Sequence, residues 1–175
     1  MQPETTQKTD HHPVNDNLEA LRQGLALLER IDERTYPVIG PHVRHVIDHY
    51  AAFFAGFDAA TIDYDARQRN PQIETEREKA QIALIDASGR LADLDRGALE
   101  RPISVRSNGG GSLEDLSRST LRRELQFLVS HTVHHWAIVR YILSRSGIEV
   151  AETFGVAPST LRYREEQVAC APQAG

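Results

Sequence analysis

Two pairs of histidines at helical spacing are the residues of this chain best placed to do chemistry. His45 and His49 form the first pair, and His131 and His135 form the second. On a helix, side chains at positions i and i+4 project from one face about one turn apart. If two such helices pack against each other, several imidazole nitrogens meet around one point, which is the arrangement that a divalent metal ion requires.

The second pair belongs to a longer stripe that also carries a carboxylate. At about 100° per residue, Glu124, His131 and His135 fall within roughly 40° of one another, with Leu128 beside them. Glu124 could orient an imidazole, or it could form an ordinary salt bridge on the helix surface. We expect Leu128 and Trp136 to wall the pocket, although Trp136 would equally serve as core packing. The alternative for the histidines is a core position with a hydrogen bond to a carbonyl oxygen.

Composition bounds the size of the protein and excludes one class of partner. At 175 residues the chain is long enough for one domain with a single core. Its formal net charge is -5 and its isoelectric point is near 5.9, with the arginines scattered among carboxylates. Nucleic acid is therefore not an expected partner.

The sequence also bears on membranes and on the cellular compartment. No segment approaches the roughly 20 consecutive apolar residues of a membrane span, so no membrane partner is expected. The lone cysteine, Cys170, cannot support a disulfide framework and favours a reducing compartment. We therefore expect a cytoplasmic protein.

Other catalytic motifs are missing from the sequence. The glycines at 109–111 are not followed by the Lys-Ser/Thr of a phosphate-binding loop, so they predict a flexible loop. The segment His131-Thr-Val-His-His135 lacks the glutamate that follows the first histidine in metalloprotease helices. The usual base for peptide hydrolysis is therefore absent.

Hydrophobic periodicity predicts an all-α protein. Apolar residues recur at three- and four-residue steps, and prolines, glycines and capping residues divide them into separate segments. A short extended or hairpin segment is expected at 101–106. The expected architecture is a four-helix bundle with this short irregular or hairpin insertion before the last long helix. The predicted helices cover residues 18–34, 41–57, 71–89 and, after capping residues at 117–120, the stretch to 146. The third of them either stops near Gly89 or continues with a break to Leu94.

The same pattern divides the chain into a domain and two tails. Residues 1–16 are predicted to be a disordered N-terminal tail, and residues 17–166 are predicted to form the helical domain. The apolar residues within 154–163 predict a segment that lies back over the bundle. Residues 167–175 are expected to be a flexible C-terminal tail.

Two segments resemble a known family. Residues 40–50, Gly-Pro-His-Val-Arg-His-Val-Ile-Asp-His-Tyr, and residues 123–135, Arg-Glu-Leu-Gln-Phe-Leu-Val-Ser-His-Thr-Val-His-His, are similar to the DinB-like (DinB/YfiT) superfamily of metal-binding four-helix bundles. The resemblance covers most of residues 18–164. It implies that His45, in a His-Val-x-Asp context, and the pair His131 and His135 hold a divalent metal ion. Three imidazoles leave a coordination position open for catalysis.

The resemblance also bears on the neighbouring polar residues. His49 is either a spare metal ligand or an acid/base group of the pocket. Asp48 and Glu124 are expected to take part in catalysis or to support the metal ligands through hydrogen bonds.

The resemblance implies a class of reaction. Family members with assigned activity look like metal-dependent transferases that use low-molecular-weight thiols. We therefore expect a metal-dependent thiol S-transferase that activates a small thiol for attack on an electrophile, or else a hydrolase. Related iron-dependent sulfoxide synthases carry His-x-x-x-His-x-Glu, where this chain has Ala137, so oxygen activation by iron is not expected. Two alternatives stay open: a non-catalytic metal-binding stress or accessory protein, and a metal-free helical interaction module.

The sequence also leads to expectations for the identity of the metal ion and for the oligomeric state. Ligation by three imidazoles suits zinc, nickel or iron, and zinc is favoured. The resemblance implies a homodimer through the bundle faces, and Ile73, Ile82 and Ile85 are interleaved with charged residues in the third predicted helix. The alternative is a monomer in which these isoleucines are scattered surface residues. We expect the dimer to bury well over ~1,000 Å².

Overall fold

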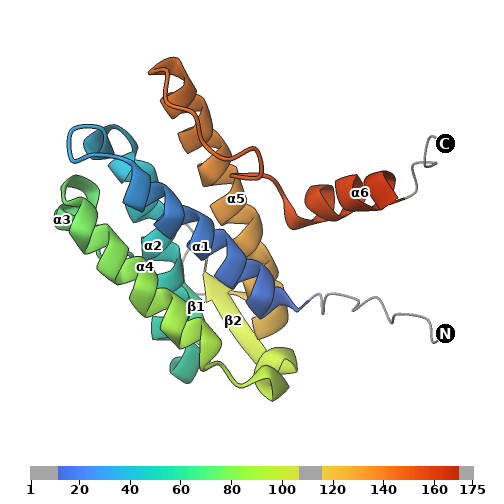
Figure 1. Cartoon of the computed structure of the whole chain (residues 1–175). Coiled ribbons are helices and arrows are strands. Elements are labelled where there is room, and N and C mark those ends of the chain that lie inside the picture. The colour runs from blue at the N-terminus through green and yellow to red at the C-terminus, as the bar shows by residue number, and fades with distance from the viewer. Residues whose placement is uncertain (1–11, 107–115, 170–175) are drawn as a thin grey trace.

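Helices make up most of the chain in the computed structural model, which describes residues 12–106 and 116–169 (Figure 1). A small three-stranded sheet accompanies them. The protein is therefore mainly α-helical, as the sequence predicts. The helices are α1 (Pro13–Arg30), α2 (Tyr36–Ala59), α3 (Pro71–Thr75), α4 (Arg77–Ala92), the 3-10 turn η1 (Arg96–Glu100), α5 (Leu121–Arg145) and α6 (Pro158–Ala169). The strands are β1 (Thr61–Asp63), β2 (Pro102–Arg106) and β3 (Ser117–Thr120).

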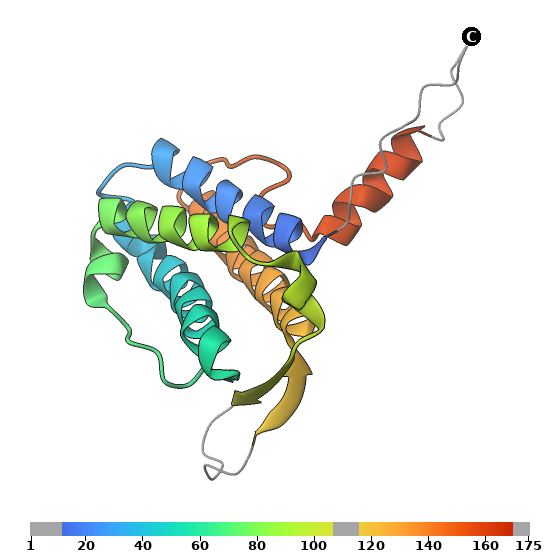
Figure 2. The same cartoon turned by 90° about the horizontal axis from the view of Figure 1, so that it is seen from below.

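Four of the helices enclose the core. Helix α1 contacts α4 and α5, and α2 contacts the same two helices from the other side (Figure 1, Figure 2). The apolar side chains between them lose nearly all contact with water, which is the main source of the fold's stability. The core includes Leu21, Leu28, Val43, Val46, Tyr50, Phe53, Leu84, Leu91, Leu121, Leu125, Leu128 and Trp136.

The first two helices begin earlier than the sequence predicts. Helix α1 starts at Pro13, where the His12 side chain accepts a hydrogen bond from the Val14 amide. Residues 13–16 therefore belong to the fold and not to the expected tail, whose residues 1–11 lie outside the described part. Helix α2 starts at Tyr36 and contains Pro41 in its interior, whereas the sequence suggested a start at Pro41. The core supplies the packing that tolerates this proline.

The third predicted helix is two helices. Glu76 has extended backbone angles (φ -113°, ψ 107°) and separates α3 from α4. Helix α3 lies against α2 so closely that a Cβ on Gly40 would stand 1.9 Å from the Glu74 carbonyl oxygen. Only glycine fits at this crossing. The Tyr36 hydroxyl donates to the Ile73 carbonyl at the same contact.

Helix α5 has clear signals at both ends. The Thr120 side chain accepts a hydrogen bond from the Arg123 amide at its N-terminus. At its C-terminus Gly147 has φ +72°, and the Ile148 amide donates to the Leu143 carbonyl. This is the pattern of a Schellman motif, and it matches the end predicted near residue 146.

The sheet exceeds the predicted hairpin by one strand. β2 and β3 pair antiparallel, and β1 pairs parallel with β2, with Ile62 opposite Val105. β1 follows α2 directly, and its last residue, Asp63, is followed by the connection 64–70 to α3. The expected glycine loop at 109–111 lies outside the described residues.

The C-terminal segment is only partly laid back over the helices. Phe154 is buried and stacks on Trp136, with ring centroids 5.7 Å apart. From Pro158 onward the chain forms α6, which projects away from the other helices in both views (Figure 1, Figure 2). The expectation of a covering segment is therefore wrong for α6, whose side chains are mostly exposed and bring few apolar groups to bury. In the described ranges, 12–106 and 116–169, we find no helix with the length and apolar character of a membrane span.

Candidate metal centre

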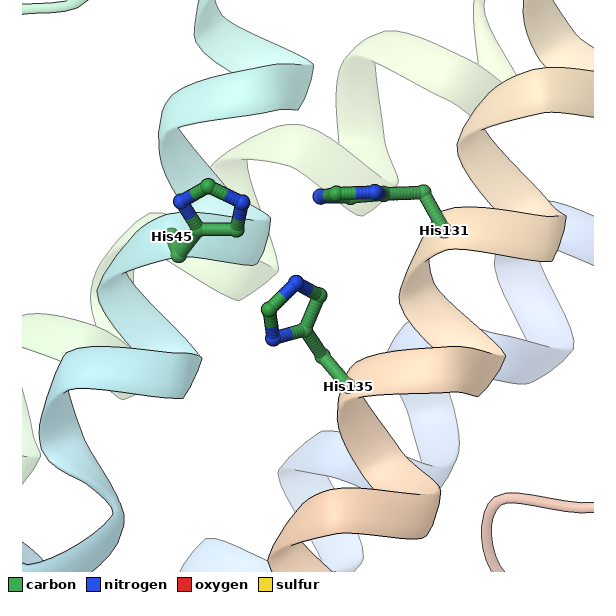
Figure 3. Close-up of side chains that lie close together, drawn as sticks. All are labelled: His45, His131 and His135. Carbon is green, nitrogen blue, oxygen red and sulfur yellow. The ribbon is translucent and has the colours of Figure 1, made fainter.

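Three histidines from two helices converge on one point. His45 projects from α2, and His131 and His135 project from α5 (Figure 3). The His45 ring centroid lies 4.9 Å from that of His131 and 4.5 Å from that of His135. One ring nitrogen of each residue lies within 4.8 Å of the other two. The predicted contact between the two histidine helices is confirmed, and the cluster is close enough to hold a metal ion.

His49 lies beside the three converging histidines but is not one of the residues whose ring nitrogens meet at that point. Its ring centroid is 4.0 Å from that of His131 and 4.4 Å from that of His45. Its Nδ1 donates to the His45 carbonyl oxygen at 2.7 Å, so its Nε2 carries the lone pair. A neutral His49 can therefore accept a hydrogen bond at the edge of the cluster.

A fifth histidine, His42, contacts His135 through a ring nitrogen. Nδ1 of His42 lies 3.0 Å from Nδ1 of His135. If His135 binds a metal through Nε2, its Nδ1 carries the proton and donates it to His42. This contact would then fix the tautomer and the orientation of the ligand.

Burial keeps these imidazoles neutral. Desolvation is the main cause that lowers the pKa of His45 to about 3, and that of His131 and His135 to about 4. Neighbouring imidazoles and Arg67 lower these pKa values further. At neutral pH each ring therefore offers one lone pair, which is the form that binds a metal ion.

Two aromatic rings wall the cluster on one side. Tyr64 stacks on His49 with centroids 5.5 Å apart, and Phe127 stacks on His131 at the same separation. Both rings also line a cavity of about 330 Å³. Phe127 lies four residues before His131, so the i,i+4 spacing could have identified it. Tyr64 follows a three-residue strand and had no comparable signal.

The two residues expected to form the pocket wall lie elsewhere. Leu128 and Trp136 are fully buried in the core. Trp136 donates its Nε1 hydrogen to the Ala20 carbonyl on α1 and packs closely on Gly24. Its ring thus points toward α1, about 100° around α5 from the face that carries His135.

The two candidate carboxylates hydrogen-bond to groups other than the histidines. Glu124 is buried, and its Oε1 accepts from Ser119 and Arg123, while its Oε2 is buried with no hydrogen-bond partner. Asp48 is also buried and accepts from Arg44 at 2.9 Å. Desolvation raises the pKa of Asp48, against the opposing effect of Arg44. Neither carboxylate orients an imidazole in this arrangement.

Arg67 is the functional candidate that sequence reasoning missed. It lies in the connection between β1 and α3, and its Nη1 is 3.1 Å from Nδ1 of His45 and 3.3 Å from both ring nitrogens of His49. A single arginine in a polar loop carries no pattern in sequence. Its role depends on where the parallel strand pair places the loop.

The donor set fits a divalent metal ion. Nε2 of His131 is buried and has no hydrogen-bond partner among the described residues, which is costly unless another group binds it. Three neutral imidazoles suit zinc and its neighbours in the first transition row. His45, His131 and His135 are thus the residues that would hold the ion.

Comparisons with known proteins give no family for this chain. No family model matches, and no solved structure matches. A curated relative, "FK506-binding protein 5" of the fungus Rhizopus delemar, is 30% identical over 108 residues, or 61% of this chain. The match covers 28% of that protein's length, so the chain spans little more than a quarter of it.

Proposed function

We propose that this protein is a DinB-like four-helix bundle that binds one divalent metal ion through His45, His131 and His135. The observation that carries the proposal is the convergence of three neutral imidazoles from α2 and α5 within 4.8 Å of one another. The three imidazoles leave a coordination position open, which is typical of a catalytic site. Zinc is the expected ion.

We further propose that the site is that of a transferase which joins a low-molecular-weight thiol to an electrophile. The ion would lower the pKa of the thiol so that the thiolate is available at neutral pH. His49 supports this use because its Nε2 can accept a hydrogen bond beside the cluster. Tyr64 and Phe127 place aromatic rings against His49 and His131, and such apolar surroundings strengthen electrostatic interactions at the site.

Metal analysis of variants tests the ligand set. We expect wild-type protein to retain about one zinc ion per chain after dialysis against a weak chelator, and His131→Ala to lose it. His134→Ala is the matched control, because His134 is an exposed residue on the same helix. The control should keep the ion. Stoichiometric zinc in His131→Ala would contradict the assignment, and absence of metal from the wild type would favour a metal-free interaction module.

A thiol screen tests the reaction class. Purified zinc-loaded protein would be incubated with small thiols and an electrophilic acceptor, and loss of free thiol would be followed against His131→Ala. The proposal predicts turnover that depends on the intact histidines. Bound zinc without turnover for any thiol would favour a non-catalytic metal-binding accessory protein.

A further inference from the structure

Arg67 makes unusual contacts for a partly buried arginine. The groups at hydrogen-bond distance from its Nη1 are nitrogens of His45 and His49. Its Nε is buried without a hydrogen-bond partner, and none of the ion pairs among the described residues includes it. A guanidinium normally binds a carboxylate or phosphate in such a place. Among the described residues no carboxylate lies at hydrogen-bond distance from Arg67, and Asp48, which interacts with it electrostatically, is bound by Arg44.

The contact with His45 excludes metal binding by the same ring. Arginine has only donors, so Nδ1 of His45 must accept, and a neutral imidazole has a single lone pair. If the metal binds Nδ1, Arg67 occupies the position of the ion. If the metal binds Nε2, the proton of the ring lies on Nδ1. The Nδ1–H of His45 and the Nη1–H of Arg67 are then both donors that point at each other, and no hydrogen bond can form. His45 can therefore bind either Arg67 or the ion.

A cavity beside Arg67 offers it another position. The cavity has a volume of about 370 Å³ and is lined by Arg67, Arg90 and Asp48 together with alanines of α2. The Asp48 carboxylate is already bound by Arg44. The cavity thus combines two guanidinium groups, one compensated carboxylate and apolar side chains, which suits a small ligand with an anionic end.

We propose that Arg67 is the anion-binding residue of the histidine site. It leaves His45 when the metal ion binds, and it then holds the carboxylate of a small substrate in the adjacent cavity. A guanidinium and a divalent cation a few ångströms apart repel each other, and an anion between them removes that repulsion. This inference rests on the proposed metal site, and it gives the substrate class as a carboxylate-bearing thiol or electrophile.

Metal affinity provides the first test, with a readout that is independent of activity. Co²⁺ would be titrated into metal-free wild type and Arg67→Gln and followed by its visible absorption. We expect Arg67→Gln to bind Co²⁺ about tenfold more tightly or better, because a competing donor and a like charge are removed. Arg69→Gln is the matched control, since Arg69 is exposed in the same connection and makes none of the hydrogen bonds to His45 and His49 that Arg67 makes. It should bind Co²⁺ like the wild type.

Ligand preference provides the second test. Mercaptoacetate and its methyl ester would be titrated into the Co²⁺-loaded proteins, and the ratio of their dissociation constants compared between variants. The comparison of ratios cancels the intrinsic difference between the two thiols. We expect the preference for the free acid to fall about tenfold in Arg67→Gln and to stay unchanged in Arg69→Gln.

These outcomes separate the inference from the proposed function. Unchanged or weaker Co²⁺ binding by Arg67→Gln, or an unchanged preference for mercaptoacetate, overturns the role of Arg67 and leaves the metal site standing. If neither the wild type nor Arg67→Gln binds Co²⁺, the metal site itself is wrong and the inference falls with it.

Discussion

At the scale of single residues, the histidine cluster should make the metal-free protein sensitive to acid. His49 shows in which direction stability changes with pH, because burial lowers its pKa to about 4 from an ordinary value of 6.5. Between these values the unfolded chain binds a proton that the folded chain does not, so stability falls as the pH falls. His49→Asn should therefore reduce the slope of unfolding free energy against pH by up to about 1.4 kcal/mol per unit. Urea unfolding of chelator-treated protein between pH 7 and pH 4.5 measures this slope, and equal slopes would contradict the prediction.

His42 provides a second prediction at this scale. Its hydrogen bond with His135 should orient the ligand, so His42→Ala should weaken zinc binding by about 10- to 100-fold without removing a ligand. Competition with a chromogenic chelator measures the affinity. His134→Ala is the control, because its ring contacts His135 only edge-on. Equal affinities for the two variants would show that His42 has no supporting role.

At the scale of elements, the sequence predicts the ligand faces of the two histidine helices better than it predicts the residues that surround the cluster. The i,i+4 spacing identifies the ligand faces of α2 and α5 because each helix places those side chains together by local geometry alone. The three-residue strand β1 is too short to give a pattern, and its pairing with β2 is a tertiary contact. Arg67 and Tyr64 owe their positions to that pairing, so no local signal reveals them.

Asn17 shows how the helices that carry the histidines are tied together. It is fully buried on α1, donates to the Leu125 carbonyl on α5 at 2.8 Å and accepts from the Tyr50 hydroxyl on α2 at 2.6 Å. Asn17→Ala leaves the Tyr50 hydroxyl without its acceptor and removes the bond to the Leu125 carbonyl, so it should lower the free energy of unfolding by roughly 1–3 kcal/mol. Glu19→Ala, at an exposed ion pair on the same helix, should cost less than about 1 kcal/mol. Chemical denaturation compares them, and a similar loss in both would contradict this account.

At the scale of the whole molecule, α4 presents an apolar surface to solvent. Ile82 and Ile85 are 56% and 60% exposed and lie three residues apart on one helix, whereas Ile73 packs against the core. We expect this face to form a homodimer. Light scattering should return twice the chain mass of 19.6 kDa for the wild type and the single-chain mass for the double variant Ile82→Glu, Ile85→Glu. A single-chain mass for the wild type would contradict the dimer.

X-ray absorption at the zinc edge tests the metal centre most directly. The measurement counts the imidazoles bound to zinc added at one equivalent to the folded protein. We predict three imidazole nitrogens at about 2.0–2.1 Å, from His45, His131 and His135, and one further light-atom ligand. A spectrum with fewer than three imidazoles, or one equal to that of hydrated zinc, would contradict the site.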